Sequence, residues 1–98
     1  MTMKISILRL AKDDLKEIHI HLSGFGEKPS EKFRESFKKF CTNVKDNPPM
    51  YGQYKYNPVY RKAVILYDYL IFYQVDEDNN TVKIYRVLHG KRNTENFI

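Results

Sequence analysis

The stretch "YLIFYQVDEDNNTVKIYRVLH", residues 69–89, decides the fold because it has the pattern of two strands joined by a turn. Its first part, 69–75, and its last part, 81–89, are rich in β-branched and aromatic residues. The cluster "DEDNN" between them consists of residues that favour turns. A further apolar run, "RKAVIL" at 61–66, comes directly before. Such short connections predict three strands in an antiparallel meander.

The N-terminal part predicts a strand followed by a helix. Residues 3–10, "MKISILRL", alternate apolar and polar positions, as half-buried strands do. In "AKDDLKEIHIHL", residues 11–22, apolar residues recur at helical spacing. Asp13 and Asp14 near the expected start suit the positive end of the helix dipole. Gly24 is expected to end this helix in the left-handed conformation.

A second helical pattern covers residues 30–47 and has an aromatic-rich apolar stripe. Ser30 is the expected N-cap, and "NPP" at 47–49 is expected to stop the helix because proline lacks an amide hydrogen. The stripe consists of Phe33, Phe37, Phe40, Cys41 and Val44. Residues 50–60 have no regular period and predict a loop.

These elements predict one α+β domain over residues 1–98 with the order β-α-α-β-β-β. The helical hairpin is expected to pack on one face of a mostly antiparallel four-stranded sheet. The first strand is free to lie beside the last.

The composition indicates a folded protein with acidic partners. Hydrophobic residues make up 42% and charged residues 30%, and the net charge is +5. The single cysteine, Cys41, excludes an internal disulfide and fits a reducing cytosol. No apolar run reaches the length of a membrane span and no secretory signal is evident, so we expect a cytoplasmic protein without membrane contact.

Positive charge gathers in two segments of the chain. Residues 81–92 contain Lys83, Arg86, Lys91 and Arg92 as well as His89, and no acidic residue. Residues 50–63 contain Lys55, Arg61 and Lys62, interleaved with four tyrosines (51, 54, 56 and 60). We expect both segments to meet along one edge of the sheet. Basic and aromatic side chains together suit a nucleic-acid ligand, although a surplus of lysine for solubility gives the same pattern.

Few residues have a pattern typical of catalysis. His19 and His21 are two apart on a helix, so they point to different sides and cannot hold a metal together. His89 stands at a strand end beside cations, which favour the neutral form of a histidine and suit a general base; a surface histidine without chemistry fits equally. No phosphate loop or metal-ligand spacing is present, and no cofactor is expected.

The order of elements, the run "YLIFYQVDEDNNTVKIYRVLHGKRN" and the preceding "NPPMYGQY" resemble the RelE/ParE superfamily of bacterial type II toxin-antitoxin toxins. The resemblance covers residues 4–97, and "RVLHGKRN" after "FYQV" is its most specific part. It implies a growth-inhibiting toxin that a cognate antitoxin neutralises by wrapping over its helices and sheet. The residues expected to bind the antitoxin are Leu15, Ile18, Leu22, Phe33 and Phe37.

The resemblance implies two alternative targets. RelE-like members cleave mRNA on the ribosome, and here Arg61, His89 and Arg92 would be the catalytic residues. ParE-like members inhibit DNA gyrase without cleavage, and here the target-binding residues would be Lys62, Arg86, Lys91 and Arg92.

The sequence departs from the RelE-like pattern at two places. Leu70 stands where such toxins have an arginine, and Phe97 or Ile98 stands where they have a tyrosine. We therefore favour gyrase, with the ribosome-dependent endonuclease as the alternative and a plain nucleic-acid-binding module as a third hypothesis.

Overall fold

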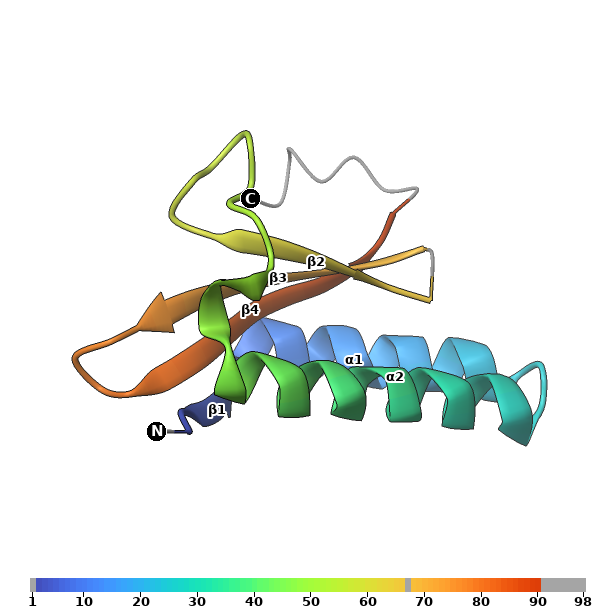
Figure 1. Ribbon diagram of the computed structural model, residues 1–98. Coiled ribbons are helices and arrows are strands. Elements are labelled where there is room, and N and C mark those ends of the chain that lie inside the picture. The colour runs from blue at the N-terminus through green and yellow to red at the C-terminus, as the bar shows by residue number, and fades with distance from the viewer. Residues whose placement is uncertain (1, 67, 91–98) are drawn as a thin grey trace.

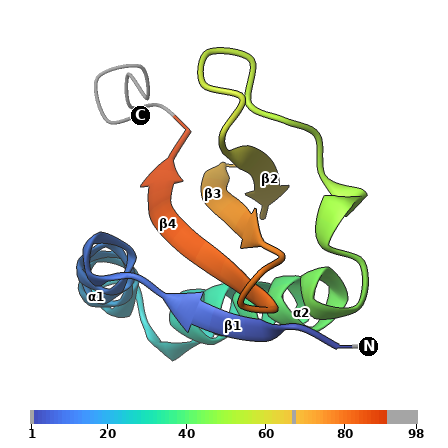
Figure 2. The same ribbon diagram turned by 90° about the vertical axis from the view of Figure 1, so that its left-hand side faces the viewer.

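A computed structural model describes residues 2–66 and 68–90. The sheet order is β1-β4-β3-β2; β1 runs parallel to β4, and the other neighbours are antiparallel. Both helices lie on one side of this sheet (Figure 1), and β1 lies beside β4 (Figure 2). The predicted architecture is therefore confirmed. The elements are β1 (Lys4–Ile7), α1 (Arg9–Ser23), α2 (Glu27–Asp46), the 3-10 turn η1 (Pro48–Met50), β2 (Arg61–Ile65), β3 (Tyr69–Asp76) and β4 (Thr81–His89).

The register of β4 changes along its length. Its first part pairs with β1 only as far as Ile84, which lies opposite Ile7. On its other side a bulge follows, because Phe72 of β3 pairs with Arg86 whereas Tyr73 pairs with Ile84, so Tyr85 is an extra residue. Among the residues that the structure describes, the last part of β4 therefore has a strand neighbour on the β3 side alone.

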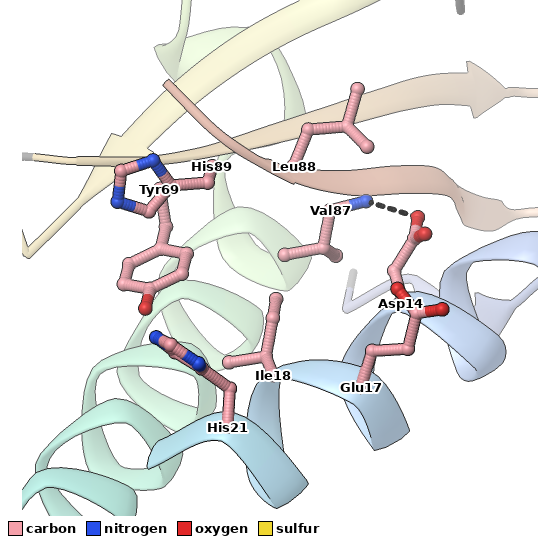
Figure 3. A pocket seen from close by; sticks show the side chains of 8 residues that line it. All are labelled: Asp14, Glu17, Ile18, His21, Tyr69, Val87, Leu88 and His89. Carbon is pink, nitrogen blue, oxygen red and sulfur yellow. Dashed lines mark hydrogen bonds between the residues drawn. The ribbon is translucent and has the colours of Figure 1, made fainter. Parts of the chain in front are cut away.

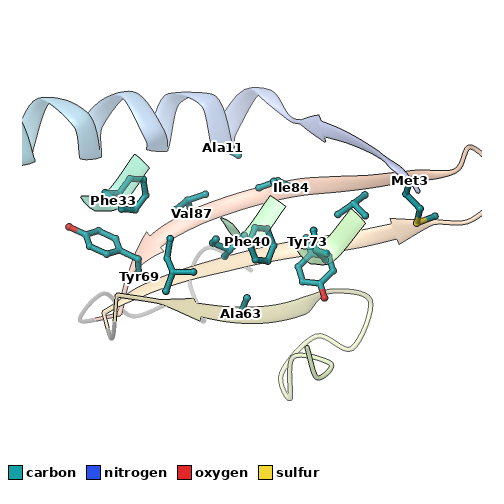
Figure 4. Packing of buried hydrophobic residues seen from close by; sticks show 13 residues of the cluster. Met3, Ala11, Phe33, Phe40, Ala63, Tyr69, Tyr73, Ile84 and Val87 are labelled. Atoms are coloured by element: carbon teal, nitrogen blue, oxygen red, sulfur yellow. The ribbon is translucent and has the colours of Figure 1, made fainter. Parts of the chain in front are cut away.

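The main core fills the space between the helices and the sheet (Figure 4). Apolar side chains of α1 and α2 meet alternate residues of the strands there, as the helical and strand periods predict. The most buried members include Ala11, Phe40, Val44, Ile71, Tyr73, Val82 and Ile84. A second, smaller cluster on the outer face of the sheet consists of Tyr54, Phe72 and Leu88.

The first strand is shorter than predicted, because the expected strand 3–10 ends at Ile7 and α1 already begins at Arg9. Asp13 and Asp14 consequently lie in the second turn, and the first turn contains no acidic residue. Their expected role at the helix dipole is wrong. Asp14 is instead buried against β4, with 6% of its surface exposed.

The link between the helices also differs from the prediction. Gly24 has a right-handed conformation with φ −65°, and Gly26 has the positive φ of 113°. Ser30 is not the N-cap, because α2 begins at Glu27; its hydroxyl is instead 2.9 Å from Nδ1 of His19 on α1. The end of α2 at Asp46, directly before "NPP", confirms the proline stop.

Two long side chains hold the loop that precedes β2. The hydroxyl of Tyr73 donates a hydrogen bond to the carbonyl of Pro48 at 2.7 Å, and Nη1 of Arg61 donates to the carbonyl of Tyr51 at 2.7 Å. Burial raises the pKa of Tyr73 to about 12. The beginning of the loop is therefore tied to β3 and to the start of β2.

Candidate functional site

A cavity of about 340 Å³ lies between α1 and the last part of β4 (Figure 3). We call it the α1–β4 pocket. Apolar side chains form part of its wall, and carboxylate, imidazole and phenol groups supply the rest. The residues that line it are Asp14, Glu17, Ile18, His21, Tyr69, Val87, Leu88 and His89.

Asp14 supplies a hydrogen-bond acceptor to the edge of β4 at this pocket. Its Oδ2 accepts a hydrogen bond from the backbone nitrogen of Val87 at 3.0 Å, in the part of β4 that β1 does not reach. The same carboxylate accepts two hydrogen bonds from Arg86, at 2.8 and 2.9 Å. These bonds raise the pKa of Arg86 further above its usual value. A helix side chain thus takes the place of a neighbouring strand.

Three ring side chains form the other end of the pocket. The rings of Tyr69 and His89 meet edge to face with centroids 5.2 Å apart. This contact follows from register, because the two residues are paired on β3 and β4. Figure 3 shows Tyr69 directed from the sheet toward α1, on the side where His21 lies. Burial, and secondly the charge of Asp68, raise the pKa of Tyr69.

The outer face of the sheet carries aromatic and basic side chains together. Tyr60 and Tyr85 stack with centroids 4.7 Å apart, and Tyr54 meets Phe72 edge to face at 4.9 Å. The Nζ of Lys62 lies 5.7 Å from the centre of the Tyr54 ring. Tyr54 and Tyr60 of the loop are therefore packed on the outer face of the sheet, and Lys62 stands over Tyr54.

Of the three predicted catalytic residues, Arg92 lies outside the described residues, and the other two are far apart. Arg61 pairs with Tyr73 on β3, whereas His89 pairs with Tyr69. Four residues along a strand span about 13 Å. The guanidinium of Arg61 is bound to the loop carbonyl of Tyr51, whereas His89 faces the α1–β4 pocket.

The predicted target-binding residues do not form a single cationic edge where the structure describes them. Phe72 on β3 pairs with Lys62 on β2 and with Arg86 on β4, so the two cations lie at the same level of the sheet. Lys62, however, stands over the outer-face tyrosines, and Arg86 turns to Asp14 on the helix side. The expected convergence is therefore wrong for this pair, because the bulge at Tyr85 and the buried carboxylate redirect Arg86. Lys91 and Arg92 lie outside the described residues.

The predicted antitoxin-binding residues are parts of the helical hairpin whose apolar sides reach the core. Phe33 is buried, and the other four are partly buried against the main core. A groove of about 190 Å³ between the helices nevertheless brings together Leu15, Leu22, Phe33 and Phe37, with His19 and Arg34 also in its lining. Ile18 lines the α1–β4 pocket instead.

Sequence reasoning identified His89 but missed Asp14, His21 and Tyr69 as its neighbours. A buried acid on the core side of a helix was the available signal, since Asp14 lies three residues after Ala11 on the apolar stripe. In the described part of the chain, no group of three His, Cys, Asp or Glu side chains could hold a metal ion. No helix described here is long and apolar enough to cross a membrane.

Comparisons with known proteins give a family and a fold. The sequence profile of a family described as "ParE toxin of type II toxin-antitoxin system, parDE" matches residues 5–94. A search of curated protein sequences found no match.

Solved structures from both branches of the superfamily are similar to this chain. A chain of the chromosomal ParDE system from P. aeruginosa has a TM-score of 0.74 and 16% identity, with 90% of this chain and 96% of that chain covered. A chain of the RelBE2 toxin-antitoxin complex from Mycobacterium tuberculosis has a TM-score of 0.68 and 17% identity, with 91% of this chain and 92% of that chain covered. A chain of the intact RelBE toxin-antitoxin complex of E. coli has a TM-score of 0.67 and 17% identity, with 92% of this chain and 99% of that chain covered. At such identities the likeness establishes the fold.

Proposed function

This chain belongs to the ParE toxin family of type II toxin-antitoxin systems, and from that premise we propose that it inhibits growth by poisoning DNA gyrase. It acts in the cytoplasm, and a cognate antitoxin neutralises it. The proposal is for inhibition by binding, without chemistry on nucleic acid.

The separation of Arg61 from His89 is the observation that carries this proposal. Metal-independent cleavage of RNA needs a base, an acid and cations around the same phosphate. The four-residue offset between their positions on the sheet, and the bond from Arg61 to the carbonyl of Tyr51, keep these two groups apart. A surface that binds a protein target does not need such convergence.

We assign the contact with gyrase to the outer face of the sheet and to the segment that follows β4. Lys62 lies on that face above packed tyrosines, and Lys91 and Arg92 follow Gly90 in the sequence. Aromatic residues and arginine are enriched at protein interfaces, which suits the tyrosines of this face and Arg92. Arg86 stabilises this surface indirectly, because its ion pair with Asp14 fixes the last part of β4 to α1.

A supercoiling assay with purified gyrase tests the proposal. The toxin is expected to inhibit supercoiling, and Arg92→Ala and Lys62→Ala are expected to weaken the inhibition. Lys38→Ala, which removes an exposed lysine from α2, serves as the control with the same change in net charge. Full supercoiling activity in the presence of the toxin at a large molar excess would exclude gyrase as the target.

The alternative function is a ribosome-dependent mRNA endonuclease, and one observation favours it. His89, Tyr69 and His21 bring three groups capable of proton transfer to one pocket. Primer extension on translated mRNA would then show codon-phased cuts that His89→Ala abolishes. The absence of such cuts with active ribosomes present would remove this alternative.

We further propose that the antitoxin lies along the groove between α1 and α2. The groove has apolar walls, and Arg34 on its rim suits an acidic partner. Arg34→Glu is expected to weaken antitoxin binding, whereas Lys55→Glu on the far face is not. Equal affinities of the two variants in isothermal titration would place the antitoxin elsewhere.

A further inference from the structure

Residues 54–60, "YKYNPVY", form a compact loop that closes on itself at its base. The backbone nitrogen of Tyr54 donates a hydrogen bond to the carbonyl of Tyr60 at 2.8 Å. Inside the loop, the nitrogen of Asn57 donates to the carbonyl of Tyr54 at 3.2 Å, and the nitrogen of Tyr60 donates to the carbonyl of Asn57 at 3.0 Å. Compact loops with close ends are frequently functional. We call residues 54–60 the tyrosine loop; it lies on the side of the sheet away from both helices (Figure 1).

Both ends of the tyrosine loop are anchored on the outer face of the sheet. The ring of Tyr54 is buried and meets Phe72 of β3 edge to face, with centroids 4.9 Å apart. The ring of Tyr60 stacks on Tyr85, the extra residue of the bulge in β4, with centroids 4.7 Å apart. The loop is therefore held in place by the sheet before it meets a partner, and such pre-organisation lowers the entropic cost of binding.

The tip of the tyrosine loop exposes apolar side chains above this anchored base. Tyr56 is 61% exposed and Val59 is 59% exposed. The Tyr56 ring meets the buried Tyr54 ring edge to face with centroids 5.6 Å apart, and Nζ of Lys55 lies 5.4 Å from the centre of the Tyr56 ring. Tyrosine is one of the residue types that contribute most to binding energy at protein interfaces. An exposed tyrosine that its neighbours already orient suits this role.

The charge and chemistry of this part of the chain favour an acidic protein as the partner. Residues 50–64 contain Lys55, Arg61 and Lys62 and no acidic residue. Lys55 and Lys62 are exposed at the loop, and such cations attract an acidic surface and fix its orientation. Val59 is aliphatic and cannot stack on a base as an aromatic ring does, so an apolar depression of a protein suits the tip better than a nucleic acid does.

We propose that the tyrosine loop determines the specificity of the toxin for its protein target. Tyr56 and Val59 enter an apolar depression of gyrase, and Lys55 pairs with an acidic residue on the rim of that depression. This inference rests on the proposed function, since it takes gyrase as the partner. It adds an apolar anchor to the proposed cationic contact, and salt does not screen the affinity that such an anchor supplies.

Surface plasmon resonance with immobilised gyrase and the purified toxin tests the inference. Tyr56→Ala is expected to weaken binding at least about tenfold, and Val59→Ser about threefold or more. The matched controls are Phe25→Ala and Ile20→Ser, which change side chains of the helical hairpin that are 71% and 62% exposed. Both controls are expected to stay within about twofold of the wild type. Lys55→Ala is expected to weaken binding about threefold at low salt and less at high salt.

Circular dichroism checks that each variant is folded, and Val59→Ser carries the same test should Tyr56→Ala unfold. Wild-type affinity of the folded loop variants, or an equal loss in the hairpin controls, would overturn the inference alone. A wild-type toxin that neither binds gyrase nor inhibits supercoiling would overturn the proposed function as well. If Tyr56→Ala and Val59→Ser instead lose affinity for a DNA oligonucleotide in the absence of gyrase, the loop binds nucleic acid, and the inference of a protein contact is wrong.

Discussion

Replacing Asp14 with alanine tests whether its carboxylate substitutes for β1 along the part of β4 beyond Ile84, which β1 does not reach. The carboxylate accepts bonds of 2.8 and 2.9 Å from Arg86 and of 3.0 Å from the backbone nitrogen of Val87. Alanine removes all three at once. The guanidinium of Arg86 then loses its partner, and the backbone donor of Val87 loses its acceptor.

The expected loss is a large part of the total stability. Removing one partner of a buried ion pair costs about 3–5 kcal/mol, and an unsatisfied buried backbone donor costs about 1–3 kcal/mol. The side chains of Arg86 and Asp14 are 13% and 7% exposed, so water relieves part of both losses. We therefore expect Asp14→Ala to lower the free energy of unfolding by about 3–5 kcal/mol, against about 5–15 kcal/mol for a typical domain.

Urea unfolding followed by circular dichroism measures this loss. Asp14→Asn retains an acceptor for Val87 and is expected to cost less, about 2–3 kcal/mol. A double-mutant cycle with Arg86→Met separates the ion pair from the backbone bond, with a coupling of about 2 kcal/mol expected. A loss below about 1 kcal/mol for Asp14→Ala would show that the carboxylate does not hold the strand edge.

Three further predictions concern the core and the hairpin. Tyr73→Phe loses the bond to the carbonyl of Pro48 and is expected to lower the free energy of unfolding by about 1 kcal/mol, measured by urea unfolding. Gly26→Ala, at φ 113°, is expected to cost about 1 kcal/mol or more in thermal unfolding, whereas Gly24→Ala, with its right-handed backbone, costs less. Burial raises the pKa of Cys41 from 9.0 to about 11. The contribution of this thiol to the free energy of unfolding is therefore fully present below pH 9 and is lost as the pH rises toward 11, because the thiol ionises first in the unfolded chain. Urea unfolding from pH 8 to 11 should show this fall, and Cys41→Ser should reduce it; an unchanged fall would assign it to other groups.

Local patterns predicted the elements well where the pattern was long and regular. The strand predicted at 81–89 coincides with β4, and the proline stop of α2 lies where it was expected. The short strand β1 and the link around Gly24 and Gly26 were predicted less well. The reason is that a boundary of a few residues depends on what packs against it, and a single residue type does not contain that information.

The site divides in the same way. The amino-acid sequence by itself determined the β-α-α-β-β-β order, the antiparallel meander, the position of His89 at a strand end and the surplus of positive charge, since these follow from periodicity and composition along the chain. Only the tertiary structure placed Asp14 and His21 in the lining of one pocket with Tyr69 and His89, and it turned Arg86 away from Lys62. Those placements depend on the length of β1, the bulge in β4 and the packing of α1 across it, and these are set by contacts between residues that are distant in sequence.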